Sequence, residues 1–417
     1  MTRACRVVVL GGSAVATPGL AEAITRIPNR TRPVELTLVG RDPQKLDVVA
    51  HVARLLAGDD PLLAITHSTD AEMALAGAEI VINQLRVGGL AARAFDESFS
   101  HDLGLPGEET VGPGGFANAS RTIPVVLEYA RIMERVCPNA TLLTFANPSS
   151  VVQYALTRYT GLYTVGMCDG PVHLIAAIAD ALNTTPDSLD VDYIGMHHYG
   201  WAVGVRRNGR EALPEALAAA AQIAPEVEPA ITQAIGAIPG PYHNYFFHPD
   251  RMLAKKAGKR TRAEELLELQ DEILEDYAQA RATGERPAAL AKRKARWYDA
   301  IVAPVLLAFA ESAVNGARSW PFILNVVNHH TVPWLPPEAI VETPVLVQHG
   351  RGRALAACDA PPEVKAWVQG NCAYEMLAVE AIVERDRVKA ARALLLNPMG
   401  ITYDQAVTIV ERAWTHG

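Results

Sequence analysis

The chain has 417 residues, of which 49% are hydrophobic, 20% charged and 6% aromatic. This composition is typical of a globular protein, so it excludes disordered, collagenous and low-complexity classes. The length is enough for two or three domains with an ample core. A net charge of −8 opposes non-specific attraction to nucleic acid or to an anionic membrane, so a small molecule is the expected partner.

The amino terminus has no secretory signal pattern, because residues 1–12 run directly into an apolar strand and glycines. The apolar stretch 301–310 is too short for a membrane span and predicts a core helix. The five cysteines are odd in number and lack CxxC spacing, which predicts reduced thiols and a cytoplasmic protein.

In chain order, the first 150 residues alternate short apolar strands with helical stretches. A helix is expected at 19–27, after the first strand. This alternation predicts an α/β fold with a Rossmann-like, doubly wound parallel sheet, whose ligand site lies beyond the carboxyl ends of the strands. The strands are expected at 6–10, 35–39, 79–83 and 141–145.

After about residue 190 the pattern becomes mixed. Strands and helices no longer alternate regularly, which predicts an α+β domain packed against the first. The expected division is a dinucleotide-binding domain at 1–190 and a substrate-binding domain at 191–417. Helices are expected at 213–224, 262–294 and 374–414, and strands at 322–327 and 340–347.

A glycine turn, Gly11-Gly12-Ser13, stands between the first strand and the first helix. This is where backbone amides can bind a dinucleotide pyrophosphate, although a tight turn without a ligand fits equally well because the spacing is not GxGxxG. The second strand ends in Gly40-Arg41-Asp42, where a ribose-binding acid is expected. Asp42 is the candidate acid. Gly40 offers no carboxylate and Arg41 would tolerate a 2′-phosphate, so NAD and NADP both stay open.

The segment 83–121 is rich in glycine and polar residues. Arg86 and Arg93 suit the bidentate binding of an anionic ligand, and glycines near Glu109 allow a close approach. The alternative is a pair of surface salt bridges on a solvated loop.

Cys168 and His198 are thirty positions apart, and a thiolate with an imidazole suits a first-row transition metal. A buried structural cysteine and a hydrogen-bonded histidine are the alternative, and the adjacent His197 leaves the ligand ambiguous. Tyr242 follows a proline-rich turn, and its phenol can serve as a base only if a metal or cation lowers its pKa.

Taken in order, these segments resemble the NAD-dependent glycosidases of glycoside hydrolase family four, the 6-phospho-α- and 6-phospho-β-glucosidases. The likeness extends over nearly the whole chain, and the order of its motifs makes it specific. It implies a cofactor domain like that of lactate and malate dehydrogenases. The motifs are VVVLGGSAVATPGL, QLRVGGLAARAFDE, EETVGPGG, FANPS, GMCDGP, GMHHYGW and PYHNYF.

The resemblance implies that Cys168 and His198 hold a divalent metal, usually manganese. It makes Tyr242 the catalytic base and places Glu109 where a carboxylate raises the basicity of this tyrosine. NAD is the implied cofactor, and the implied assembly is a homodimer or homotetramer. Positions that match substrate-binding residues of the family are Arg93, Asn147 and Arg262.

The implied reaction begins with oxidation of the sugar at C3 by the nicotinamide, which acidifies the C2 proton. Tyr242 removes that proton, and the aglycone leaves by elimination with Asp169 as proton donor. Asp169 is typical of members that cleave α-linked 6-phosphoglycosides. Water addition and hydride return complete the turnover.

Four positions depart from the family pattern, at Gly40, Glu108, Gly170 and His197. Two other functions stay open, the first because the family resembles lactate and malate dehydrogenases in its cofactor domain. One is a net NAD-dependent oxidoreductase acting on a hydroxy acid or sugar, and the other is a dinucleotide-binding sensor without catalysis.

Overall fold

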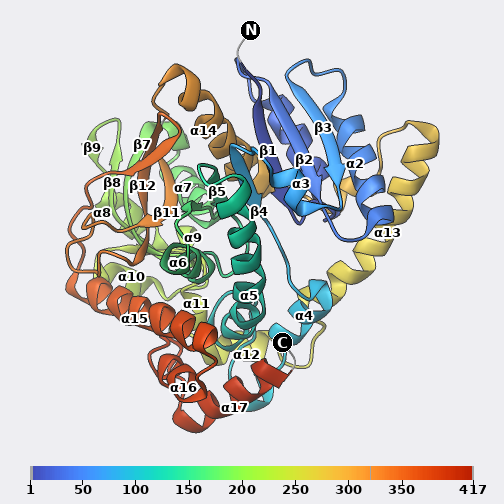
Figure 1. The fold of residues 1–417 in the computed structure, drawn as a ribbon. Coiled ribbons are helices and arrows are strands. Elements are labelled where there is room, and N and C mark those ends of the chain that lie inside the picture. The colour runs from blue at the N-terminus through green and yellow to red at the C-terminus, as the bar shows by residue number, and fades with distance from the viewer. Residues whose placement is uncertain (1–2, 320, 416–417) are drawn as a thin grey trace.

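The computed structural model describes residues 3–319 and 321–415. In its first half, apolar strands alternate with helices that cover both faces of a sheet (Figure 1). The elements of this half are β1 (Cys5–Leu10), α1 (Pro18–Arg26), β2 (Val34–Val39), α2 (Pro43–Ala57), β3 (Leu63–Ser68), α3 (Ala71–Leu75), β4 (Ile80–Asn83), α4 (Gly89–Asp96), α5 (Gly112–Val136), β5 (Thr141–Thr144), α6 (Ser149–Tyr159), β6 (Tyr163–Gly166) and α7 (Gly170–Ala181).

The six strands of this half are parallel in the order β3-β2-β1-β4-β5-β6, which confirms the predicted doubly wound sheet. The chain runs outward from β1 to β3 and then crosses back to β4, so the strand order reverses between β1 and β4. The register pairs Leu10 with both Val39 and Asn83, and Asn83 with Thr144. The residues that follow these strands therefore emerge side by side at one edge of the sheet.

The second half continues the same sheet with antiparallel strands. Strand β11 pairs with β6, and the combined sheet has 13 strands. The predicted domain boundary after residue 190 falls inside β7, so it stays a prediction. The added strands are β7 (Leu189–Met196), β8 (Tyr199–Arg207), β9 (Arg210–Glu211), β10 (Ile238–Pro239), β11 (Phe322–Val327), β12 (Ile340–Gln348) and β13 (Arg351–Ala354).

The helices of the second half differ from the expected ranges. The stretch expected at 213–224 divides into two short helices, and the one expected to end at 294 stops before Gly284, which adopts a left-handed backbone with φ of +75°. The helices are α8 (Leu213–Ala218), α9 (Ala220–Ile223), α10 (Pro229–Ile235), α11 (Asn244–Phe247), α12 (Pro249–Lys256), α13 (Arg262–Thr283), α14 (Ala303–Asn315), α15 (Pro362–Glu384), α16 (Arg387–Leu395) and α17 (Tyr403–Thr415).

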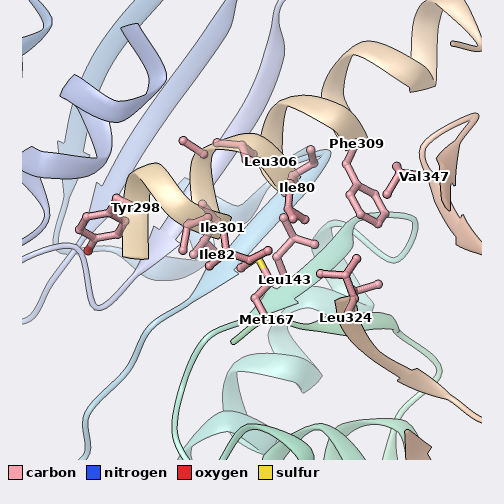
Figure 2. Close-up of a cluster of buried hydrophobic side chains, with 14 of the residues drawn as sticks. Ile80, Ile82, Leu143, Met167, Tyr298, Ile301, Leu306, Phe309, Leu324 and Val347 are labelled. Carbon is pink, nitrogen blue, oxygen red and sulfur yellow. The ribbon is translucent and has the colours of Figure 1, made fainter. Parts of the chain in front are cut away.

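The core helix α14 joins the two halves. It is preceded by a π-helical segment, Tyr298–Val302, and Figure 2 shows both packed against side chains of β4, β5 and β11. By length and composition alone, residues 298–315 would suffice to cross a membrane, but 56% of this stretch is buried within the protein. This burial agrees with the core helix predicted at 301–310. Leu306 and Phe309 are at most 1% exposed.

Candidate active site

A cavity of about 360 Å³ lies at the carboxyl ends of β1, β2, β4 and β5. Helix α13 closes one side with Leu266, Leu269 and Ile273. A capping box between Thr261 and Glu264 starts this helix. Residues of the strand ends that line the cavity are Gly11, Ser13, Gly40, Arg41, Gln84, Arg86 and Asn147.

The glycine turn after β1 is required by close backbone packing. Gly11 has φ of +85°, and a Cβ atom there would lie 2.9 Å from the Gln84 carbonyl oxygen. The Gly12 amide donates to the Val39 carbonyl at 2.7 Å, and a Cβ at Gly12 would lie 2.8 Å from the Val39 nitrogen. Gly11 and Ser13 line the cavity, whereas Gly12 packs against β2. The turn therefore brings backbone to the cavity wall closely enough to suit a dinucleotide phosphate.

Asp42 caps helix α2. Its Oδ1 accepts hydrogen bonds from the Gln44 and Lys45 amides, both at 3.0 Å. Asp42 is not among the residues lining the cavity, so the structure gives its carboxylate a local role in starting α2. Its predicted contact with a ribose stays a prediction.

Glu109 is buried between two arginines. Its carboxylate forms ion pairs with Arg86 and, at 3.0 Å, with Arg93 Nη1. Burial alone would raise the pKa of Glu109, but Arg86, Arg93 and a hydrogen bond from Asn147 outweigh burial and lower it. The solvated salt bridges considered from sequence are thus excluded for Glu109, which is 5% exposed. Arg86 and Asn147 also line the cavity and join it to Glu109.

Four arginines lie close enough for their charges to interact, and two of them, Arg86 and Arg293, line the cavity. Arg293 lies over the Trp297 ring at 4.8 Å, and its pKa is lowered to about 10, first by burial and then by the charges of Arg93, Arg262 and Arg86. Arg262 itself is more than half exposed and pairs with Glu265 at 2.6 Å. Arg262 does not line the cavity, but its charge contributes to the lowered pKa of Arg293. This concentration of positive charge favours an anionic ligand.

Cys168, His197 and His198 form a cluster in which the potential ligand atoms lie within 4.8 Å of one another. Cys168 follows β6, and the two histidines form the turn between β7 and β8. The predicted pair is therefore brought together, and His197, which sequence analysis left ambiguous, joins it as a third candidate ligand. A thiolate with two imidazoles suits a divalent transition metal.

The protonation states fit a metal centre. Burial lowers the pKa of His198 to about 3 and that of His197 well below its usual value, so both imidazoles are neutral at pH 7. Burial, followed by the charges of Glu342 and Asp169, raises the pKa of the Cys168 thiol. A divalent cation would supply the positive charge that a thiolate needs here.

Thr110 orients His198. The Thr110 hydroxyl is 2.7 Å from His198 Nδ1, and it also hydrogen-bonds to the buried Glu108 carboxylate. With Nδ1 in contact with Thr110, Nε2 of the same ring would be the nitrogen available to a metal. Sequence analysis missed Thr110, since its neighbour in space is 88 positions away in the chain.

Tyr242 stacks on His198 with ring centroids 3.5 Å apart and 10° between the planes. Burial raises its pKa well above the usual value, and the negative charges of Glu108, Cys168, Glu109 and Asp169 raise it further, in that order. Among these charges Glu108 has a larger effect than Glu109, and the expected role of Glu109 toward Tyr242 stays a prediction. A tyrosinate at this position would be a strong base.

Asp169 lies directly before helix α7 and beside the cluster. Its Oδ2 lies 3.2 Å from His173 Nε2, one turn along this helix. The hydrogen bond to Asp169 raises the pKa of His173. His173 thus holds the Asp169 carboxyl group in one orientation.

Two family models cover most of the chain. The model described as family 4 glycosyl hydrolase matches residues 6–184, and the model of the C-terminal domain of family 4 glycosyl hydrolases matches residues 193–400.

The chain is similar to curated proteins along most of its length. It is 30% identical to a probable 6-phospho-beta-glucosidase of Bacillus subtilis, with 96% of this chain and 93% of the relative covered. It is 26% identical to a 6-phospho-alpha-glucosidase of Leptotrichia buccalis, with 94% and 92% covered. Relatives of both linkage types therefore match.

The fold is similar to that of a 6-phospho-beta glucosidase from Thermotoga maritima solved with manganese, NAD+ and glucose-6-phosphate. The TM-score is 0.87 at 25% identity, with 100% of this chain and 98% of that chain covered. A lactate dehydrogenase from Eimeria maxima gives a TM-score of 0.50 at 15% identity, covering 94% and 96%, which is a likeness of fold alone. The predicted relation to the dehydrogenase fold is confirmed.

Proposed function

The chain belongs to the family 4 glycosyl hydrolases, and from this premise we propose that it cleaves a 6-phosphorylated glycoside with a nicotinamide dinucleotide and a divalent metal. The observation that supports the proposal is that Glu109 connects the cavity at the strand ends with Tyr242 and the Cys168–His197–His198 cluster. Arg86 and Asn147 line the cavity and contact Glu109, and the charge of Glu109 acts on both Tyr242 and His197.

Cys168 and His198 would hold the metal, with His197 as a third donor. Gly11, Ser13 and Arg86, which line the cavity, would bind the dinucleotide. The chemistry expected of the bound groups is reversible hydride transfer at sugar C3 by the dinucleotide and Lewis acidity toward the sugar oxygens by the metal. Solved relatives with NAD+ and manganese support this choice of cofactors.

Tyr242 removes the proton from C2 of the sugar. Its stacking on His198 supports a place beside the metal ligands, and its raised pKa makes the ionised phenol a strong base. Asp169 donates a proton to the departing glycosidic oxygen, and His173 orients its carboxyl group. A carboxylic acid can protonate a poor leaving group, which supports an α linkage.

A 6-phosphate on the sugar is supported by the four arginines whose charges interact. Guanidinium groups bind phosphate by paired hydrogen bonds, and Arg93 is held in place by ion pairs with the buried carboxylates of Glu97 and Glu109. The charges of Arg93 and Arg262 act on Arg293, which lines the cavity. Asn147 contributes an amide to sugar binding.

The decisive experiment uses α- and β-linked nitrophenyl glucosides, with and without 6-phosphate, in the presence of NAD+ and Mn²⁺. We expect nitrophenol release that depends on both cofactors, without net formation of NADH, and faster cleavage of the phosphorylated α anomer. Equal kcat/KM with and without the phosphate would reject phosphate recognition, and faster cleavage of the β anomer would reject the α linkage. Net NADH formation would indicate an oxidoreductase instead.

We also propose that the chain forms a homodimer or homotetramer in the cytoplasm. Most of its exposed large apolar side chains lie on or between the C-terminal helices α15 to α17, including Val388, Leu395 and Tyr403. All five cysteines are free, which supports a reducing compartment. Light scattering of the purified chain measures the assembly.

A further inference from the structure

The cavity at the strand ends is strongly cationic. Arg41, Lys45, Arg86 and Arg293 line it, and none of the described residues that line it carries a carboxylate. This contrasts with the net charge of −8 for the whole chain. A ligand with several negative charges fits such a cavity better than a ligand with one.

The end of β2 lacks the acid that usually holds a ribose in dinucleotide-binding folds. Gly40 occupies the first position after β2, and a Cβ atom there would lie 2.8 Å from Ser13 Cβ and 2.9 Å from Ser13 Oγ. An aspartate or glutamate at position 40 would therefore require the β1–α1 turn to shift. The nearby carboxylate of Asp42 accepts two helix amides instead.

Two cations stand where the acid is missing. Arg41 is exposed, and its guanidinium makes no hydrogen bond or ion pair within the described part of the chain. Lys45 is half-buried in the first turn of α2, where its ammonium donates to Gln270 Oε1 of α13 at 3.3 Å. Both side chains border the cavity beside β2, the side on which parallel dinucleotide folds place the adenosine ribose.

We propose that Arg41 and Lys45 form a binding site for a ribose 2′-phosphate, so that this cavity accepts NADP+ at least as tightly as NAD+. The inference rests on the proposed dinucleotide function of the cavity. A carboxylate at the end of β2 would repel a 2′-phosphate, whereas a guanidinium with an ammonium attracts it and can donate several hydrogen bonds to it. The solved relative with NAD+ does not address this difference.

The test measures the dissociation constants of NAD+, NADP+, ADP and 2′,5′-ADP by calorimetry with the purified full chain. The two adenosine diphosphates compare nucleotides with and without a 2′-phosphate in the absence of nicotinamide. Arg41→Ala and Lys45→Met should each weaken NADP+ and 2′,5′-ADP roughly ten- to a hundredfold, since hydrogen bonds to charged groups have this size. Binding of NAD+ should change less than about threefold, the effect of a distant charge.

Arg210→Ala is the matched control, because it removes an exposed arginine of β9 that does not line the cavity. It should change no affinity, and thermal unfolding of each variant checks the fold. NADP+ binding more than about tenfold weaker than NAD+ would overturn the inference while leaving the dinucleotide assignment intact. Equal weakening of both dinucleotides by Arg41→Ala would also overturn it. Failure of the wild-type chain to bind either dinucleotide would overturn both proposals.

Discussion

The two ends of the site are built in opposite ways. At the cationic end, Arg41 lies just after β2 and Lys45 in the first turn of α2, and both side chains line the cavity. At the metal end, Cys168, His197 and Tyr242 come from separate parts of the chain and are largely buried, and burial disfavours charge on each of them. The first end attracts anions as it stands. At the second end, a bound cation would favour the ionised forms of Cys168 and Tyr242 while His197 stays neutral.

The largest effect is expected when the Cys168 thiol is removed from the cluster. Cys168→Ser should lower metal-dependent turnover about a thousandfold or more, because a Lewis-acid metal contributes several kcal/mol. Turnover and bound metal are measured after EDTA treatment and readdition of Mn²⁺. Cys358→Ser, which changes an exposed cysteine, is the control and should retain both. Full activity of the metal-free Cys168→Ser protein would reject the metal centre.

Tyr242→Phe tests the buried base. We expect turnover to fall roughly 10²- to 10⁴-fold, the size of a general-base contribution. Reaction in D₂O should place deuterium at C2 of the product in the wild type. Tyr245→Phe alters a neighbouring tyrosine, 6.3 Å away between ring centroids, and should have a much smaller effect. A wild-type product without deuterium at C2 would favour displacement by two carboxylates instead.

Thr110→Val leaves the three candidate metal ligands in place and removes only the hydroxyl that contacts His198. Loss of the hydroxyl beside His198 Nδ1 should weaken Mn²⁺ binding roughly 10- to 100-fold. Titration calorimetry with Mn²⁺ measures the change. Thr110→Ser keeps the hydroxyl and should restore most of the affinity, an outcome that a purely steric effect of valine would not produce.

Glu375→Gln tests how much a buried carboxyl group of α15 lowers the free energy of unfolding as the pH rises. Burial raises the pKa of Glu375 from 4.5 to about 8, and hydrogen bonds from Ser150 and Asn371 reduce this rise only in part. The unfolded chain loses the Glu375 proton near pH 4.5 and the folded chain near pH 8, so between these values folding becomes less favourable as pH rises. The slope is at most about 1.4 kcal/mol per pH unit.

Urea denaturation at pH 6 and pH 8 measures this slope in the free energy of unfolding. Glu375→Gln should reduce the difference between the two pH values. Glu363→Gln removes an exposed carboxylate from the same helix and serves as the control. An identical pH dependence in the wild type and in Glu375→Gln would show that Glu375 carries no such penalty.

Sequence alone predicted a parallel, doubly wound sheet, located its strands β1, β2, β4 and β5, and supplied the candidate residues of the site. Strands such as Cys5–Leu10 and Ile80–Asn83 are apolar runs followed by polar residues or glycines, and this pattern is local. The pairing of Cys168 with His198, and the place of Tyr242 beside them, followed from motif order. Strands β3, β7 and β8 were not predicted, because their polar and glycine residues weaken the local pattern.

Only the tertiary structure decided which side chains meet. Sheet register brings the strand ends together, and the β7–β8 turn places His197 beside Cys168. The contact of Thr110 with His198 and the enclosure of Glu109 by two arginines depend on distances that spacing does not specify. Burial likewise depends on packing, and it is burial that makes these histidines neutral and raises the pKa of Tyr242.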